Sequence, residues 1–393
     1  MPKLTIHRVP LGGKRVFLRA DLNAPLEGGG VSDDTRLRAV VPTIQMALGA
    51  GASVVLSSHL GRPKGKPTPE FSLKPVAERL GTLLGRDVPL APDCIGPAVE
   101  AQARALEPGQ ILLLENLRFH KEEEANDDAF ARALAALADV YVNDAFAAAH
   151  RAHASIAAIT RHLQPAAAGL LMERELEALG RVLEAPARPM LAILGGAKVS
   201  DKVTLVENLL ARVQAVAIGG GMAFTFLRAL GHDVGRSLVE AEHVNTARRV
   251  LDAAKQRGVD VLLPADAVVA AGLDSPSGRI VGVDAIPAGE MGLDIGPRTV
   301  ERFTGAIRDA RTIVWNGPMG VFERAPFAQG TMAIAHAVAG ASAFSVIGGG
   351  DSVAAVNAAG VADRIGYIST AGGAFLEFLE GRTLPGVVAL TDA

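Results

Sequence analysis

Four short apolar segments in the first half of the sequence are each followed, within a few residues, by an arginine. These arginines are Arg19, Arg62, Arg118 and Arg151, and His59 stands close to Arg62. Guanidinium groups bind carboxylate and phosphate oxygens through paired hydrogen bonds. One such arginine is more often part of a surface salt bridge, but four at equivalent positions favour a binding site. We therefore expect this half to hold a small anion that carries several charges.

Other polar residues in this half are suited to the same ligand. Asp21 and Asn23 follow Arg19 closely, and they can accept from and donate to a ligand hydroxyl group. Arg36 stands at the start of a predicted helix, just behind the sequence Ser32-Asp33-Asp34. We expect these side chains to lie beside the arginines.

The histidines of this half have alternative interpretations. His150 and His153 could hold a metal ion, but neither a cysteine nor a carboxylate stands at a matching spacing. A structural or phosphate-facing role is therefore favoured for this pair. His59 could act as a general base, but nothing beside it resembles an orienting triad.

The second half of the sequence carries glycine-rich segments after its apolar runs. The glycines of these segments begin at Gly195, Gly219, Gly317 and Gly348. Glycine lets backbone N–H groups approach a phosphate closely, and the N-terminus of a following helix favours negative charge. Asp351, at the start of such a helix, could bind Mg²⁺ together with water and phosphate oxygens. This half is therefore predicted to bind a nucleotide.

Two common nucleotide-binding motifs are absent from the sequence. Gly61 is followed five residues later by Lys66, where the motif of P-loop nucleotide hydrolases requires glycine. Phe224 stands where a dinucleotide-binding motif beginning at Gly219 would need its last glycine. A P-loop enzyme and a simple dinucleotide-dependent oxidoreductase are both disfavoured.

Short apolar runs alternate with segments of helical periodicity along the whole chain. This alternation indicates βαβ units, and strands that are apolar throughout are typical of parallel sheets covered on both faces. We predict an α/β protein with parallel sheets in both halves, and such sheets bind ligands at the carboxyl ends of their strands. The predicted strands are Val16–Leu18, Ser53–Leu56, Ile111–Leu114, Val140–Val142, Leu191–Leu194, Ala215–Ile218, Val261–Leu263, Thr312–Trp315 and Phe344–Ile347.

The length of 393 residues exceeds that of a single hydrophobic core. A charged amphipathic helix over Met172–Glu184, followed by a proline-rich stretch, separates the two halves. We therefore expect an anion-binding domain over residues 1–171, a connector over 172–188 and a nucleotide-binding domain over 189–371. The remaining residues, 372–393, include a predicted helix at Phe375–Glu380 and an apolar tail that must pack on another part of the protein.

Composition and charge limit the possible partners. The net charge of −3 attracts the chain neither to nucleic acid nor to an anionic membrane surface. The longest uncharged stretch, residues 325–350, divides into a helix-like half and a strand-like half, so a membrane span is disfavoured. The single cysteine, Cys94, and the lack of an apolar leader near the N-terminus indicate a cytoplasmic protein. We expect small-molecule ligands and a monomer.

The ordered motifs resemble the phosphoglycerate kinase family over essentially the whole chain. They read RADLNAP from Arg19, HLGRPKG from His59, ENLRFHKEEE from Glu115, NDAF from Asn143, AHRAHAS from Ala149, GGAKVSDK from Gly195, GGGMAFTF from Gly219, WNGPMGVFE from Trp315 and GGGDS from Gly348. The resemblance implies two Rossmann-like, three-layer domains joined by a helix and a hinge, with the C-terminal segment returning to the first domain. It also implies reversible phosphoryl transfer between 1,3-bisphosphoglycerate with ADP and 3-phosphoglycerate with ATP, in glycolysis and gluconeogenesis.

The resemblance carries residue roles onto the matching positions. The phosphoglycerate would be held by Asp21, Asn23, Arg36, His59, Arg62, Arg118 and Arg151. The nucleotide would be held by Lys198, Lys202, Gly219, Gly220, Leu293, Asn316, Pro318, Glu323, Gly349, Gly350, Asp351 and Ser352, with Asp351 also on Mg²⁺. The sequence departs from the family pattern at Ala20, Ala24, Ala147 and Ala371, the last of which stands near the expected hinge.

The implied reaction agrees with the residues present. Its acceptor is a carboxylate that is already ionised at neutral pH, so no general base is needed. Lys198 and Arg36 are expected to neutralise the transferred group from different halves of the chain. A kinase that forms an acyl phosphate on another small carboxylate is an alternative. A catalytically inactive nucleotide-binding protein is a second alternative, disfavoured because Lys198, Arg36 and Asp351 are all present.

Overall fold

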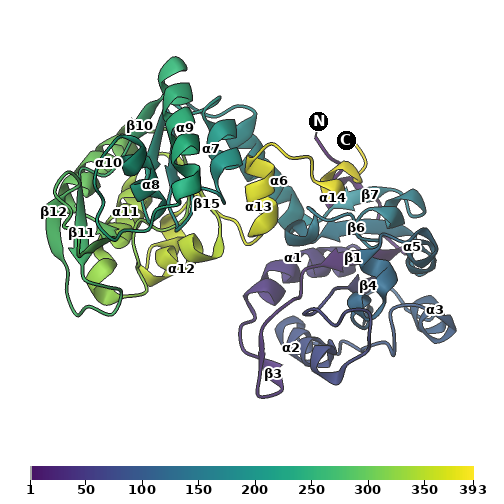
Figure 1. The fold of residues 1–393 in the computed structure, drawn as a ribbon. Helices are drawn as coiled ribbons and strands as arrows, with labels where there is room; N and C mark the ends of the chain where they lie inside the picture. The colour runs from purple at the N-terminus through teal and green to yellow at the C-terminus, as the bar shows by residue number, and fades with distance from the viewer. Residues whose placement is uncertain (1) are drawn as a thin grey trace. The chain divides into compact units, whose positions relative to one another are not determined.

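A computed structural model describes residues 2–393, and the chain divides into two compact units. The first unit comprises Met1–Glu177 with Thr383–Ala393, and the second comprises Ala178–Arg382 (Figure 1). The sequence placed the corresponding boundaries near residues 171 and 371. Each unit is built around its own parallel sheet with helices packed on it.

The first unit contains a five-stranded parallel sheet in the order β5-β4-β1-β6-β7. Its strands are β1 (Arg15–Ala20), β4 (Ser53–Ser57), β5 (Ile111–Leu113), β6 (Val140–Asp144) and β7 (Ala166–Ala168). Its helices are α1 (Thr35–Gly49), α2 (Lys74–Leu84), α3 (Pro97–Arg104), α4 (Lys121–Glu124), α5 (Asp128–Ala135) and α14 (Pro385–Val388), with the first part of α6 (Leu170–Leu183). A small hairpin joins β2 (Leu26–Glu27) to β3 (Gly30–Val31).

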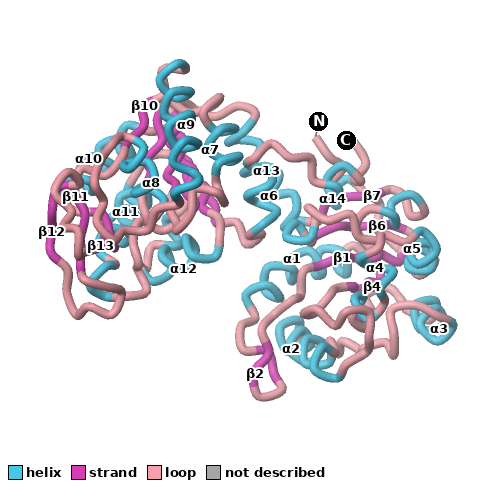
Figure 2. Tube along the Cα trace, in the orientation of Figure 1, coloured by secondary structure: helices cyan, strands magenta, loops and turns pink. Residues whose placement is uncertain are grey.

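The second unit contains a six-stranded parallel sheet in the order β10-β9-β8-β14-β15-β16. Its strands are β8 (Met190–Leu194), β9 (Ala215–Ile218), β10 (Asp260–Leu262), β14 (Thr312–Asn316), β15 (Phe344–Ile347) and β16 (Tyr367–Ile368). Its helices are α7 (Val203–Leu209), α8 (Met222–Ala229), α9 (Val244–Gln256), α10 (Pro297–Asp309), α11 (Gln329–Gly340), α12 (Gly350–Ala358) and α13 (Gly373–Leu379). Figure 2 shows how helices and strands alternate along this unit.

The strand order of both sheets is that of the Rossmann fold. In each unit the chain reverses direction across the sheet beside its first strand, at β1 and β6 in one unit and at β8 and β14 in the other. Ligands of open parallel sheets bind at the carboxyl ends of the strands that flank this point. The predicted α/β class and the parallel sheets are confirmed.

One part of the second unit was not predicted. Strands β11 (Asp266–Ala270), β12 (Arg279–Gly282) and β13 (Met291–Ile295) form a separate antiparallel sheet in the order β12-β11-β13. Parallel sheets were expected in both halves, and these short strands were not recognised because polar and glycine-rich residues lie between them. This small sheet carries Leu293, one of the predicted nucleotide-binding residues.

Side-chain alternation divides each sheet into two buried faces. In β1, Val16, Leu18 and Ala20 belong to the core that α1 and α2 cover, while Phe17 and Arg19 point to the opposite face. Phe17 stacks on Tyr141 of β6 there, with ring centroids 6.1 Å apart. The opposite face is therefore also buried, as a parallel sheet requires.

Several predicted elements appear close to their expected positions. The stretch 325–350 divides into α11 and β15, and the predicted helix over Met172–Glu184 is α6. None of the helices within residues 2–393 is long and apolar enough to cross a membrane. The short strands β7 and β16 were missed, since three alanines or two residues leave too weak a pattern.

Carboxylates from distant strands cap the N-termini of several helices. Asp144, at the end of β6, accepts hydrogen bonds from the backbone N–H groups of Leu171 and Met172 in α6. Asp294 in β13 accepts one from Gly330 in α11 at 2.6 Å. Burial raises the pKa of Asp144 to about 6 and that of Asp294 to about 7. These side chains fix the position of each helix relative to its strand.

The cap of α10 provides a test of this arrangement. Asp266, only 1% exposed, accepts hydrogen bonds from Arg298 N–H at 3.0 Å, Thr299 N–H at 2.9 Å and the Thr299 hydroxyl at 2.7 Å. Replacing Asp266 with alanine leaves these donors buried without a partner. We expect Asp266→Ala to lower the free energy of unfolding by about 1–3 kcal/mol.

Urea unfolding followed by circular dichroism measures this loss. Asp309→Ala is the matched control, because it removes an exposed carboxylate from the last residue of the same helix. An Asp266→Ala protein that unfolds at the same urea concentration as the control would contradict the capping role.

Candidate functional site

At the carboxyl edge of the first sheet, Asp21 and Asn23 organise the loop that follows β1. Asp21 is buried, and its carboxylate lies 2.6 Å from a guanidinium nitrogen of Arg36. The side-chain oxygen of Asn23 accepts a hydrogen bond from Gly61 N–H at 2.9 Å. These two contacts join the loop after β1 to the start of α1 and to the loop after β4.

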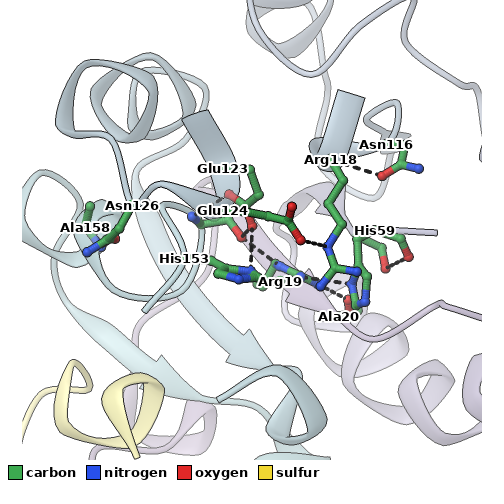
Figure 3. Close-up of polar contacts among 12 residues, drawn as sticks. Arg19, Ala20, His59, Asn116, Arg118, Glu123, Glu124, Asn126, His153 and Ala158 are labelled. Atoms are coloured by element: carbon green, nitrogen blue, oxygen red, sulfur yellow. Dashed lines mark hydrogen bonds and ion pairs between the residues drawn. The ribbon is translucent and has the colours of Figure 1, made fainter. Parts of the chain in front are cut away.

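Arg118 is held over the same loop. Its guanidinium donates to the carbonyl oxygen of Gly61 at 2.9 Å, and its backbone N–H donates to the side chain of Asn116. The Nε atom of Arg118 lies 3.3 Å from a carboxylate oxygen of Glu124, which is half exposed (Figure 3). Most of the Arg118 side chain is thus buried, and its orientation is fixed before any ligand binds.

The remaining predicted residues of this site differ in exposure. His59 is buried, Arg151 is half-buried and Arg62 is exposed. Burial and the charge of Arg19 lower the pKa of His59, with Arg118, His153 and Arg151 adding to the effect. Burial, Arg118 and Arg19 likewise lower the pKa of His153, to about 3. At neutral pH both histidines are uncharged, and the arginines supply the positive charge.

Arg19 has a different place from the one its sequence position indicated. The expectation that β1 ends at Leu18 was wrong, because the strand continues to Ala20. Alternation along the strand then directs Arg19 into the face of the sheet, where it is fully buried. Arg62 and Arg151 keep exposed surface, whereas Arg19 is fully enclosed and Arg118 is mostly buried.

Two buried residues next to this site escaped the sequence analysis. Glu123 and Ser155 are both fully buried, and they contact each other through two hydrogen bonds. Glu123 stands among three consecutive glutamates. The sequence does not reveal which of them turns inward, although the motif ENLRFHKEEE contains all three.

In the second unit, three glycine loops lie in direct backbone contact. Gly196 N–H donates to the carbonyl oxygen of Pro318 at 3.1 Å, and Gly220 N–H donates to that of Met319 at 3.0 Å. A Cβ atom added to Gly220 would lie 2.6 Å from Gly196 N and 2.9 Å from Pro318 O. Gly220 also has a positive φ of 65°. Glycine is therefore required here for both space and backbone conformation.

These loops border a pocket of about 390 Å³. Its wall includes five of the predicted nucleotide-binding residues, namely Gly220, Leu293, Pro318, Glu323 and Asp351. Apolar side chains that the sequence analysis did not select make up much of the rest, among them Phe224, Leu238, Leu273 and Met291. Leu238 and Leu273 are 44% and 48% exposed, which is unusual for leucine. The pocket offers an apolar slot next to a cluster of backbone N–H groups.

The other predicted residues of this unit form a polar network behind the loops. Lys202 donates to the side chain of Asn316, and Ser352 accepts from Gly317 N–H at 2.6 Å. Burial lowers the pKa of Lys202. Lys198 is exposed, and Gly219, Gly349 and Gly350 lie outside the pocket wall. The structure therefore places Asn316 and Lys202 as supports of the loops that precede α12.

Asp351 stands in the first turn of α12, exposed and at the edge of the pocket. It forms no compact group with two other potential metal ligands among residues 2–393. Mg²⁺ in kinases is bound by one or two carboxylates together with substrate phosphates and water. A single exposed carboxylate at the edge of the pocket fits that mode of binding.

Comparison with known proteins identifies the family. The family model described as phosphoglycerate kinase matches residues 6–382. The phosphoglycerate kinase of Moorella thermoacetica is 58% identical, with 100% of both chains covered, and that of Acidobacterium capsulatum is 57% identical with the same coverage. The chain belongs to the phosphoglycerate kinase family. The resemblance stated from the motifs is thereby confirmed.

Solved structures of phosphoglycerate kinases agree with this assignment. That of Coxiella burnetii has a TM-score of 0.93 and 44% identity over 99% of this chain and 98% of its own. That of Pyrococcus horikoshii has a TM-score of 0.84 and 36% identity, with 98% of each chain covered. Phosphoglycerate kinases are nucleotide-dependent kinases, and this chain has the family's glycolytic phosphoglycerate kinase function.

The close contact between the glycine loops leads to a prediction for the Gly220→Ala variant of this phosphoglycerate kinase. We expect Gly220→Ala to weaken ADP binding, because the new Cβ forces the Gly196 and Pro318 backbones away from the pocket. The positive φ alone costs about 1–2 kcal/mol, and the clash adds to this loss of stability. Calorimetric titration with ADP and urea unfolding measure the two effects.

Gly258→Ala is the matched control for backbone strain. Gly258 has a φ of 67°, nearly that of Gly220, but a Cβ there has no atom within 4 Å. Equal ADP affinities in the two variants would show that the close approach of the loops has no part in nucleotide binding.

Proposed function

We propose that the first unit of this phosphoglycerate kinase binds the phosphoglycerate and that the second binds ATP or ADP. The observation that carries this proposal is the linked set of side chains at the edge of the first sheet. Asp21 contacts Arg36, while Asn23 and Arg118 both contact Gly61. His59, Arg62 and Arg151 belong to the same predicted set. Guanidinium groups held in fixed orientations are well suited to phosphate and carboxylate oxygens.

The acceptor is a carboxylate, and the transfer needs no general base. Burial and the neighbouring arginines lower the pKa values of His59 and His153, so both imidazoles are neutral at working pH and neither is an imidazolium that could act as a general acid. Neutral imidazoles instead supply hydrogen bonds. The remaining requirement is that the reacting groups be aligned and their negative charge neutralised.

Lys198 and Arg36 are the residues proposed to neutralise the transferred phosphoryl group. Lys198 is exposed beside the glycine loop at 195–196, and Arg36 is partly exposed at the start of α1. Lys198 is thus accessible to a ligand, and Arg36 presents its partly exposed guanidinium in an orientation set by Asp21. The Gly349–Ser352 turn would stabilise charge on the leaving nucleotide through backbone N–H groups.

Mg²⁺ is the proposed metal, with Asp351 as its protein ligand. The metal would neutralise charge on the nucleotide phosphates when bound. Burial lowers the pKa of Lys202, and the charges of Asp201 and Asp351 partly oppose this lowering. Asp351 also lines the pocket in which the nucleotide of a metal–nucleotide complex would lie.

Because the two ligand sets belong to different compact units, we propose that the units close on each other during turnover, about a connector that includes α6. Closure would permit direct in-line transfer. A monomer suffices for this mechanism, since one chain holds both ligand sets. The cytoplasm is the proposed location, as a glycolytic reaction requires.

A coupled assay with 3-phosphoglycerate and ATP tests the proposed reaction and the role of Lys198. We expect Lys198→Ala to lower kcat roughly 10²–10³-fold, the effect of losing one preorganised transition-state donor. The KM values for both substrates should change much less. Lys255→Ala, an exposed lysine of α9 in the same unit, is the control. A near-normal kcat in the Lys198 variant would remove it from the transition state.

Small-angle scattering tests the closure. The radius of gyration should be smaller with 3-phosphoglycerate and a non-hydrolysable ATP analogue together than with either one alone, because only the pair provides contacts for both units. The same value under all three conditions would argue against a closing step.

A further inference from the structure

A continuous chain of hydrogen bonds runs beneath the proposed phosphoglycerate site. Glu123 accepts from Ser155 N–H at 2.9 Å and from the Ser155 hydroxyl at 2.6 Å. The Ser155 hydroxyl oxygen accepts from Arg19 Nε at 2.9 Å, and Arg19 Nη2 lies 3.2 Å from His59 Nδ1. Figure 3 shows Arg19 between Glu123 and His59. The chain thus connects a buried carboxylate to a histidine of the binding site.

The chemistry of Arg19 decides the hydrogen-bonding role of His59. A guanidinium group has only donors, so His59 Nδ1 must accept the hydrogen bond from Arg19 Nη2. An imidazole that accepts at Nδ1 while neutral carries its proton on Nε2. His59 therefore has an N–H donor on the side away from Arg19.

The position of the Arg19 side chain is fixed by several hydrogen bonds. Its Nη1 atom donates to the carbonyl oxygen of Ala20, so all three nitrogens of the guanidinium have partners. Glu123 supplies the compensating charge for this buried arginine through Ser155, and neither Arg19 nor Glu123 is exposed. Tyr141 fixes Ser155 from the other side, since its hydroxyl donates to the Ser155 carbonyl oxygen at 2.8 Å.

We propose that Glu123, Ser155 and Arg19 are positioning residues that hold His59 in its Nε2–H tautomer, as a ready-made hydrogen-bond donor for an anionic oxygen of phosphoglycerate. This inference rests on the proposed function of the first unit. It assigns Glu123 and Ser155 a part in substrate affinity although neither can touch the substrate. It also gives the buried Arg19 a role distinct from that of Arg62, Arg118 and Arg151.

The proposal explains why the site contains uncharged histidines among arginines. A neutral Nε2–H group donates to an oxygen without adding a further charge to those of Arg118 and Arg151. If His59 took the other tautomer, two N–H donors would face each other across 3.2 Å, and a lone pair would face the anion. Both contacts would be repulsive.

Nuclear magnetic resonance of the full-length protein, labelled with ¹⁵N in its histidine rings, tests the tautomer directly. The His59 signals are assigned by their loss in His59→Gln. In the unliganded wild-type protein we expect the pattern of a protonated Nε2 and an unprotonated Nδ1. A protonated Nδ1 or an imidazolium pattern near neutral pH would overturn the proposal.

Ser155→Ala tests the chain of hydrogen bonds, because it removes the hydroxyl bridge and leaves the backbone contact to Glu123. We expect the His59 signals to shift toward an average of both tautomers. The KM for 3-phosphoglycerate should rise roughly three- to tenfold, the effect of weakening one hydrogen bond, while kcat and the KM for ATP stay near their wild-type values. Unchanged His59 signals in Ser155→Ala would overturn the role of the bridge.

Glu123→Gln and Glu122→Gln form a matched pair on one helical turn. Both remove one negative charge, but only Glu123 is fully buried and contacts Ser155. We expect Glu123→Gln to act like Ser155→Ala and Glu122→Gln to act like the wild type. The same His59 signals in both variants would contradict the role of Glu123, and thermal unfolding identifies a variant that is merely unstable.

The two readouts separate this inference from the function on which it rests. A wild-type Nε2–H tautomer together with an unaltered KM for 3-phosphoglycerate in His59→Gln would contradict the substrate role of His59. It would leave the arrangement of Glu123, Ser155 and Arg19 intact. The opposite result is a raised KM for 3-phosphoglycerate in His59→Gln together with a protonated Nδ1 in the wild type. It would support the substrate role of His59 and contradict the proposal that Glu123, Ser155 and Arg19 set its tautomer.

Discussion

The burial of the Arg19 charge is the constraint on which the first unit depends. A guanidinium group inside a sheet face is unfavourable unless each of its donors has a partner and its charge is compensated. Ser155, Ala20 and His59 supply the partners, and Glu123 supplies the charge. These contacts bring together segments around residues 20, 59, 123 and 155. Since Arg118 and Arg151 lie in or next to the same segments, the placement of these two arginines is tied to that of Arg19.

The second unit depends on a different constraint, the close approach of the backbones of its glycine loops. The loops at Gly195, Gly220 and Gly317 contact one another through peptide groups rather than side chains. Any Cβ at Gly220 would separate them, whereas the charge of the site lies on a few flexible side chains around the edge. One unit therefore presents guanidinium groups held by buried acids, and the other presents peptide N–H groups held by glycines. Both arrangements are suited to binding phosphate groups. The guanidinium groups suit a small phosphorylated acid, and the peptide N–H groups suit the phosphates of a nucleotide.

The pattern of apolar runs was sufficient to predict the two parallel sheets, because strands buried on both faces must be apolar throughout. It also located the carboxyl ends of those strands, where Arg118, Gly220 and Asn316 stand. It failed for the antiparallel sheet that carries Leu293, since its strands are short, lie among polar and glycine residues and, in β12, are largely exposed. It failed for the pocket wall too, because Leu238 and Leu273 come from loops whose packing no local signal reveals.

By itself, the sequence determined which chemistry each half can perform and to which family the chain belongs, since both depend on residue types in a fixed order. Only the tertiary structure decided which of those residues face a ligand. Arg19 and Arg62 both follow apolar runs, yet Arg19 is enclosed in a sheet face and Arg62 is exposed. Glu123 is buried while its neighbours in the same turn are not. The reason is physical: burial depends on what packs against a side chain, and for Arg19 and Glu123 those partners lie many residues away along the chain.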